Sequence, residues 1–162
     1  MRKIRRRKIK HFNKLASSYD SFMSELVRPE YNANLTMVDG RIGWKIKFSP
    51  NCSVKFVLLE HEENSIYLST IETTPDEECR GMGYGSLVMN LIANIADKYN
   101  STIHLIASSF GDKKVEERLL REWYSKFGFE DFDRSQRMVR YPKGSSNDTG
   151  SDYDSDDKID RF

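Results

Sequence analysis

The chain has 162 residues and a formal net charge of +1 at pH 7, and 31% of its residues are charged. Its length suits one domain with a core of its own, and its apolar runs are too short for a membrane-spanning helix. The basic N-terminus has no apolar stretch behind it, which argues against a secretory signal. Two cysteines, Cys52 and Cys79, are too few for a disulfide framework or a metal site, so we expect reduced thiols in a cytoplasmic protein.

Charge is distributed unevenly along the chain. Residues 1–14 carry eight Lys or Arg and no acid, whereas residues 144–162 carry six Asp against two cations. The acidic end has almost no apolar content, so it cannot offset the entropy lost on ordering, which predicts disorder. The chain therefore divides into a basic arm (1–11), a folded domain (12–142) and a disordered acidic tail (143–162).

Hydrophobic periodicity predicts the first elements of the folded domain. Apolar residues from Phe12 to Leu26 recur every three or four positions, as on one face of a helix that ends before Pro29. Four strands follow within residues 34–73, because Asp39-Gly40 and "SPN" at 49–51 are turn signals between strand-like runs. This segment is predicted to form an antiparallel meander.

The period becomes helical again from Leu87 to Ala96. The next apolar run, "TIHLIA" at 102–107, predicts a strand parallel to the last meander strand, because a helix lies between the two. A helix over 113–127 follows, with Gly128 as its stop, and "FEDF" and "RMVRY" predict two short closing strands. The predicted class is α+β, with an antiparallel meander leading into a β-α-β unit.

Three glycines, Gly81, Gly83 and Gly85, fall within five positions between Arg80 and the predicted helix. Unpaired N–H groups at a helix N-terminus bind anions, and the missing side chains let a phosphate approach them. A bound phosphate is our interpretation, and a tight turn that requires positive φ is the alternative. The Rossmann fingerprint fails at Ser86, and the Walker pattern lacks its Gly-Lys-Ser/Thr.

Two motifs carry a resemblance to a known family. "RGMGYG" at 80–85 fits the pattern R/Q-x-x-G-x-G/A, and "REWYSKFGFE" at 121–130 is similar to an "FYxKxGFE" segment. In this order they resemble the GCN5-related N-acetyltransferase (GNAT) family, over roughly residues 53–142. The resemblance implies a mixed sheet whose two central parallel strands, here 65–73 and 102–107, splay apart.

The resemblance also implies acetyl-CoA as a co-substrate. Its pyrophosphate is expected at the glycine loop, and its pantetheine arm along the edge of strand 65–73. The cofactor-binding residues expected from this placement are Ile71, Thr73, Arg80, Gly81, Met82, Gly83, Tyr84, Gly85 and Ser86.

Three features depart from the family pattern. Four residues, "DEEC", separate Pro75 from Arg80, and we expect the two glutamates, Glu77 and Glu78, to point away from a pyrophosphate. Glu117 stands where the family often has asparagine. The N-terminal third, which builds the acceptor pocket in the family, matches only loosely.

The reaction implied by the resemblance is direct attack of a primary amine on the thioester, without a covalent enzyme intermediate. The amine must lose a proton and the leaving thiolate must gain one. Tyr124 occupies the family's tyrosine position and is the candidate general acid, with core packing as its alternative role. Trp123 and Phe127 on the same helix are expected to be packing residues. Glu72 is the candidate general base, and Glu60, His61 and Glu62 are other candidates.

The acceptor stays open between a protein lysine, a protein N-terminus, a polyamine and a small antibiotic amine. The basic arm suits nucleic acid, an acidic protein or the acidic tail, although it can equally be a solvated helix end. A competing function is a non-catalytic acyl-CoA-binding or interaction module on the same fold. We expect a monomer or homodimer in the cytoplasm, or in the host cytoplasm if the chain is encoded by a phage, as some compact family members are.

Overall fold

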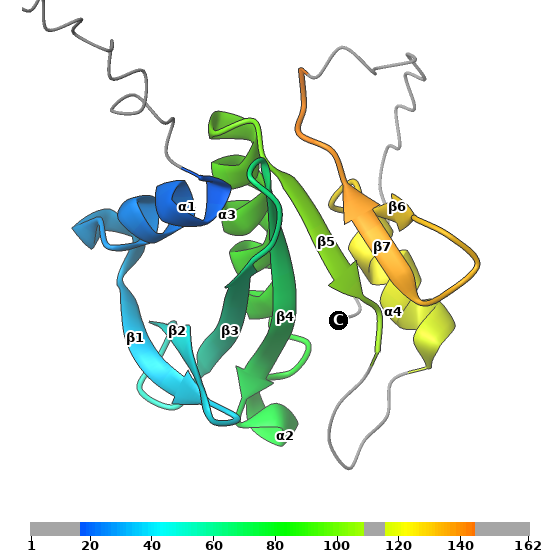
Figure 1. Ribbon diagram of the computed structural model, residues 1–162. Helices are drawn as coiled ribbons and strands as arrows, with labels where there is room; N and C mark the ends of the chain where they lie inside the picture. Colours follow the sequence, from blue (N-terminus) through cyan, green and yellow to red (C-terminus); the bar gives the residue numbers. More distant parts are fainter. Residues whose placement is uncertain (1–16, 109–115, 145–162) are drawn as a thin grey trace, which may run out of the picture.

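The computed structural model describes residues 17–108 and 116–144 (Figure 1). The elements are α1 (Ser18–Leu26), η1 (Pro29–Tyr31), β1 (Ala33–Val38), β2 (Arg41–Lys47), β3 (Ser53–Glu60), β4 (Ser65–Thr74), α2 (Asp76–Cys79), α3 (Tyr84–Lys98), β5 (Thr102–Ile106), α4 (Glu117–Ser125), β6 (Glu130–Asp131) and β7 (Arg137–Arg140). The strands form one sheet in the order β1-β2-β3-β4-β5-β7-β6. The predicted basic arm and most of the predicted acidic tail lie outside the described residues.

The predicted meander is confirmed. Strands β1 to β4 pair antiparallel with their neighbours in chain order. The turn between β1 and β2 consists of Asp39 and Gly40, which both have positive φ, as a tight hairpin turn requires. Among the described residues, no helix has the length and apolarity needed to cross a membrane.

The core lies between the sheet and the helices α1, α3 and α4. Figure 1 shows α3 running behind the central strands. The face of α3 that packs on the sheet consists of fully buried apolar side chains at helical spacing: Val88, Met89, Ile92, Ile95 and Ala96. Leu87, which the periodicity placed on this face, is instead 55% exposed.

Strands β4 and β5 separate after a short parallel pairing, which confirms the predicted splay. Their ladder covers four residue pairs, from Ser65 with Thr102 to Leu68 with Leu105. A bulge follows at once, because the register of β4 against β3 skips Ser69. A bulge bends the strand that carries it. Among the described residues, β4 therefore continues to Thr74 without a ladder partner on its β5 side.

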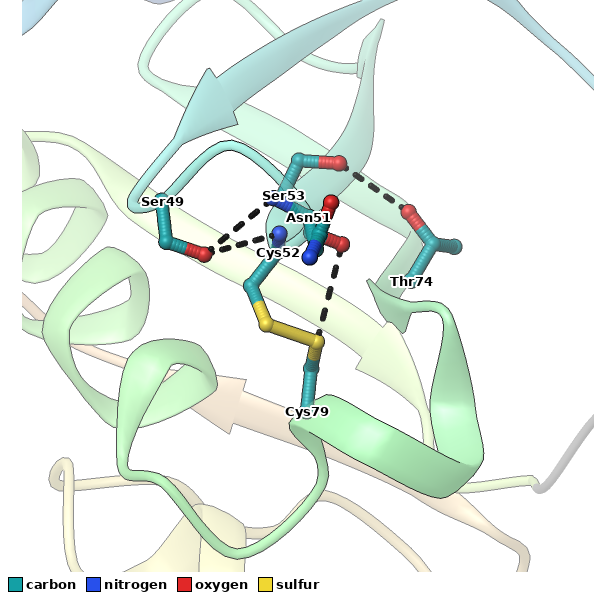
Figure 2. The surroundings of a disulfide bond; sticks show 6 residues. All are labelled: Ser49, Asn51, Cys52, Ser53, Thr74 and Cys79. Carbon is teal, nitrogen blue, oxygen red and sulfur yellow. Dashed lines mark hydrogen bonds between the residues drawn. A yellow bond between two sulfur atoms is a disulfide. The ribbon is translucent and has the colours of Figure 1, made fainter.

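The expectation of two reduced thiols is wrong, because Cys52 and Cys79 form a disulfide bond (Figure 2). The short helix α2, which the sequence did not predict, places Cys79 over the turn before β3. The two Cα atoms lie 5.7 Å apart although 27 positions separate them in sequence. Disulfides are rare in cytosolic proteins, so the cysteines no longer support a cytoplasmic location, which stays a prediction.

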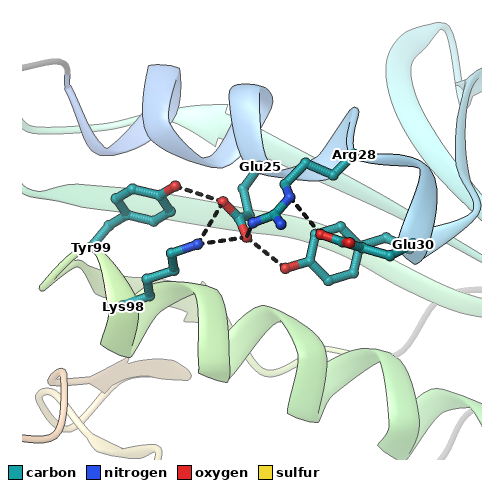
Figure 3. Close-up of polar contacts among 6 residues, drawn as sticks. Glu25, Arg28, Glu30, Lys98 and Tyr99 are labelled. Carbon is teal, nitrogen blue, oxygen red and sulfur yellow. Dashed lines mark hydrogen bonds and ion pairs between the residues drawn. The ribbon is translucent and has the colours of Figure 1, made fainter.

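Helix α1 is joined to η1 and α3 through the buried carboxylate of Glu25 (Figure 3). The hydroxyls of Tyr31 and Tyr99 donate to it at 2.6 Å each, and Lys98 and Arg28 donate at 3.0 and 3.1 Å. The hydrogen bonds from Tyr31, Tyr99 and Lys98 lower the pKa of Glu25 to about 2. This carboxylate therefore has a structural role. Helix α1 itself starts at Ser18, and Ser17 is its N-cap.

Candidate active site

The glycine loop has an open, left-handed backbone. Gly81 and Gly83 have φ values of +84° and +80°, and a Cβ built on either would meet nothing within 4 Å. The alternative of a turn requiring positive φ is therefore correct for these two glycines. A turn of this kind is compatible with anion binding, because no atom occupies the space that a side chain at Gly81 or Gly83 would fill. Gly85 has no such constraint, and a Cβ there would lie at ordinary contact distance, 3.6 Å, from Trp123.

The loop ends at the N-terminus of α3. Gly83 is the N-cap and provides no side-chain acceptor, and the first turn of α3 contains no acidic residue. The helical hydrogen bonds begin with the N–H of Leu87, which donates to the carbonyl of Gly83 at 3.1 Å. The N–H groups of residues 84–86 thus precede the first helical bond and sit at the positive end of the helix dipole. This arrangement suits a phosphate.

The side chains around the loop differ in exposure. Arg80 and Met82 are exposed, as are the glutamates of α2, Glu77 and Glu78. The ring of Tyr84 stacks on Phe48 with centroids 4.6 Å apart, so its side chain is used in packing and its N–H is the group available to a ligand.

The unpaired edge of β4 leads from the splay to this loop. Ile71 and Thr73 lie beyond the last β4–β5 pair, and both are partly buried. The Oγ1 atom of Thr73 would lie 3.7 Å from a Cβ at Gly85, so the end of the strand meets the start of α3. The end of the strand edge therefore lies beside the helix N-terminus.

Helix α4 brings the second sequence motif to the first. The indole Nε1 of Trp123 donates to the hydroxyl of Ser86 at 3.3 Å, across 37 positions of sequence. The same ring would be the nearest group to a Cβ at Gly85. We expected Trp123 to be a plain packing residue, but it connects the two motifs directly.

Tyr124, the candidate acid, is 6% exposed and packs edge-on against Trp123 and Phe129. Burial, and then the neighbouring Tyr67, raise the pKa of Tyr124 to about 12. Tyr67 lies on β4 next to Leu68, the last residue paired with β5. The candidate acid therefore neighbours a residue of β4 that lies next to the point at which the two strands separate.

The candidate bases lie at opposite ends of β4. Glu72 is partly buried, pairs in register with Lys55 of β3, and lies on the half of β4 that has no β5 partner. Glu60, His61 and Glu62 precede the paired half, where Nδ1 of His61 is 2.7 Å from the hydroxyl of Ser65. Nothing in this geometry selects one of them, so Glu72 stays a prediction.

His104 was not singled out from the sequence, yet it lies in register with Tyr67. Its ring stacks on His61 with centroids 4.5 Å apart, and Phe132 packs edge-on against it. Burial, and then the neighbouring His61, lower the pKa of His104. Its position in an alternating apolar strand gave the only sequence signal, and strand pairing was needed to place it beside the splay.

Glu117, at the position where the family often has asparagine, is used within the protein. Its carboxylate forms an ion pair with Arg121 at 3.0 Å and accepts a hydrogen bond from Gln136 at 3.0 Å. These contacts join α4 to the segment before β7. The departure from the family pattern therefore has a structural use here.

No family model and no curated protein matches the chain. Solved structures with a related arrangement include the anti-CRISPR protein AcrVA5, which is 22% identical with a TM-score of 0.43, over 60% of this chain and 96% of that one. Ard1 from Thermoplasma volcanium is 18% identical with a TM-score of 0.41, over 76% and 79% of the two chains. The structure of the KacTA–DNA complex contains a chain that is 14% identical with a TM-score of 0.39, over 84% of this chain and 86% of that one. At such low identities and TM-scores, these similarities identify no family and carry no argument about chemistry.

Proposed function

We propose that the protein is an N-acyltransferase that transfers the acetyl group of acetyl-CoA to a primary amine. The observation that carries this proposal is the hydrogen bond from Trp123 to Ser86, which lies beside Gly85 and the end of β4 at Thr73. It joins the unpaired edge of β4, the open N-terminus of α3 and the aromatic end of α4 at one place. A long ligand with a phosphate at one end and amide groups along its length suits such a surface.

The residues present fit the co-substrate. The N–H groups of residues 84–86 and the exposed Arg80 would hold the pyrophosphate, with Gly81 and Gly83 leaving it room. The edge of β4 at Ile71 and Thr73 would pair with the amides of the pantetheine arm, as an added strand does. When bound, acetyl-CoA supplies an activated thioester.

The proton transfers fall to residues near the splay. The amine nitrogen forms a bond to the acetyl carbon, the carbon–sulfur bond breaks, and the sulfur must receive a proton. Tyr124 is protonated at neutral pH and is our candidate for donating this proton; its pKa, raised to about 12, makes it a weaker acid than an ordinary phenol. Glu72 is our candidate for accepting the proton of the amine, with Glu60, His61 and Glu62 as the other candidates.

One substitution tests the binding half of the proposal. Gly85→Asp places a carboxylate in the first turn of α3, where negative charge favours the helix and a Cβ makes ordinary contacts. We expect unchanged or higher thermal stability together with loss of the rise in melting temperature that acetyl-CoA causes in the wild type. Gly85→Asn is the matched neutral control and should retain part of that rise. An undiminished rise in Gly85→Asp would exclude pyrophosphate binding at this loop.

A second substitution tests turnover. Tyr124→Phe keeps the ring and removes the proton donor, and general acid catalysis is worth roughly 10²–10⁴-fold, so we expect transfer to slow at least tenfold. Acetyl-CoA binding should be unchanged, and Tyr19→Phe on α1 is the matched control. Thiol release is measured with an acceptor found by mass spectrometry of a lysate incubated with labelled acetyl-CoA. Binding without transfer to any amine would instead support a non-catalytic acyl-CoA-binding module.

A further inference from the structure

A hollow of about 330 Å³ lies at the other end of β4 and β5, away from the glycine loop. Its walls come from the turn before β4, the first half of β5 and Tyr141. The proposed co-substrate site uses none of these residues, with the exception of the alternative base Glu62.

The turn that forms one wall is held by hydrogen bonds to three elements. The carbonyl of Glu63 accepts from the N–H of Ser18 on α1, and that of Asn64 accepts from Thr102 on β5, both at 2.9 Å. Glu62 and Ser65 are joined twice, because the N–H of each donates to an oxygen of the other at 3.1 Å. The hollow is therefore part of the fixed fold.

The side chains around the hollow are suited to a cation. Glu62 and Glu63 are exposed, and within residues 17–108 and 116–144 neither carboxylate has an ion-pair partner. His104 also lines the hollow, and burial followed by the nearby His61 lowers its pKa, which disfavours a positive charge on the imidazole. The half-exposed ring of Tyr141 adds an aromatic surface, which attracts cations.

We propose that this hollow binds one ammonium group of a linear aliphatic polyamine, with Glu62 and Glu63 as its counter-charges. The inference rests on the proposed function, since another amine of the same molecule would be the one acetylated. From Ser65 to Leu68, where the strands separate, β4 advances three residues, or about 10 Å. A triamine such as spermidine spans a comparable length when extended, whereas a monoamine cannot reach both places.

Spermidine binding by titration calorimetry tests the assignment, using the full chain at low ionic strength without acetyl-CoA. Glu62→Gln/Glu63→Gln removes both counter-charges from an exposed turn. Exposed ion pairs contribute about 0.2–1 kcal/mol each, so we expect spermidine to bind about 2–30-fold more weakly. Glu116→Gln/Glu122→Gln, at the exposed N-cap of α4 and on its exposed side, is the matched control because it changes the net charge equally. Its affinity for spermidine should remain that of the wild type.

Several results would overturn the assignment. These are wild-type affinity in the Glu62→Gln/Glu63→Gln variant, equal weakening in the α4 control, or butylamine or a lysine peptide binding as tightly as spermidine. In the transfer assay, we expect the KM for spermidine to rise in Glu63→Gln with little change in kcat, because this variant leaves the alternative base Glu62 in place. Intact, Glu62/Glu63-dependent binding without any acetyl transfer would refute the proposed function and leave the ammonium site in place.

Discussion

Removal of the Cys52–Cys79 disulfide should destabilise the protein strongly. The bond closes a loop of 27 positions. In the chain-entropy model this removes about 12 cal/mol/K from the unfolded state, which corresponds to about 3.6 kcal/mol at 25 °C. We therefore expect Cys52→Ala and Cys79→Ala each to lower the free energy of unfolding by about that amount and the melting temperature by roughly 10–20 °C.

The double variant is the internal control. Either single substitution already breaks the bond, so the two effects should not add, and the double variant should be about as stable as each single one. Urea unfolding followed by fluorescence of the buried Trp44 measures the free energy. Alkylation without reductant, read by mass spectrometry, should leave both wild-type cysteines unmodified. Ready alkylation of both thiols in the folded wild type, or single variants within about 0.5 kcal/mol of it, would refute the reasoning.

Two further predictions concern the fold around the site. The pKa of Glu25 is about 2 in the folded protein against an ordinary value of 4.5. The stability that its charge provides is therefore present above pH 4.5 and is lost as the pH falls toward 2. Urea unfolding at pH 7 and pH 3 should show a smaller change in the free energy of unfolding in Glu25→Gln than in the wild type. Gly128→Ala forces φ of +91° on alanine and brings its Cβ to 3.4 Å from Nε of Arg140, so the free energy of unfolding should fall by about 1–2 kcal/mol. Gly40→Ala, at a position with positive φ and no atom near the added Cβ, measures the backbone cost alone. An equal loss of unfolding free energy in Gly40→Ala and Gly128→Ala would show that the contact with Arg140 adds nothing.

Most strands and the longer helices of this fold were predictable from sequence because local interactions determine them. Asp39-Gly40 favours the positive φ of a tight hairpin turn, and Gly128 lets the chain leave α4 with positive φ. Apolar spacing predicted α3 and the four meander strands, since burial of one face requires that spacing. Sequence also placed the glycine loop before a helix, from which we predict an anion site at the N-terminus of that helix.

Only the tertiary structure decided which distant residues meet. The bulge at Ser69 and the early end of the β4–β5 ladder determine where the sheet opens, and no local pattern encodes a register between strands that are far apart in sequence. The disulfide depends on α2, a helix of four residues that is too short to show periodicity. The hydrogen bond of Trp123 to Ser86 depends on the packing of α4 against the start of α3, which the sequence did not predict. The neighbours of His104 likewise follow from its pairing with Tyr67. Contacts of this kind arise from the packing of whole elements, which sequence spacing alone does not specify.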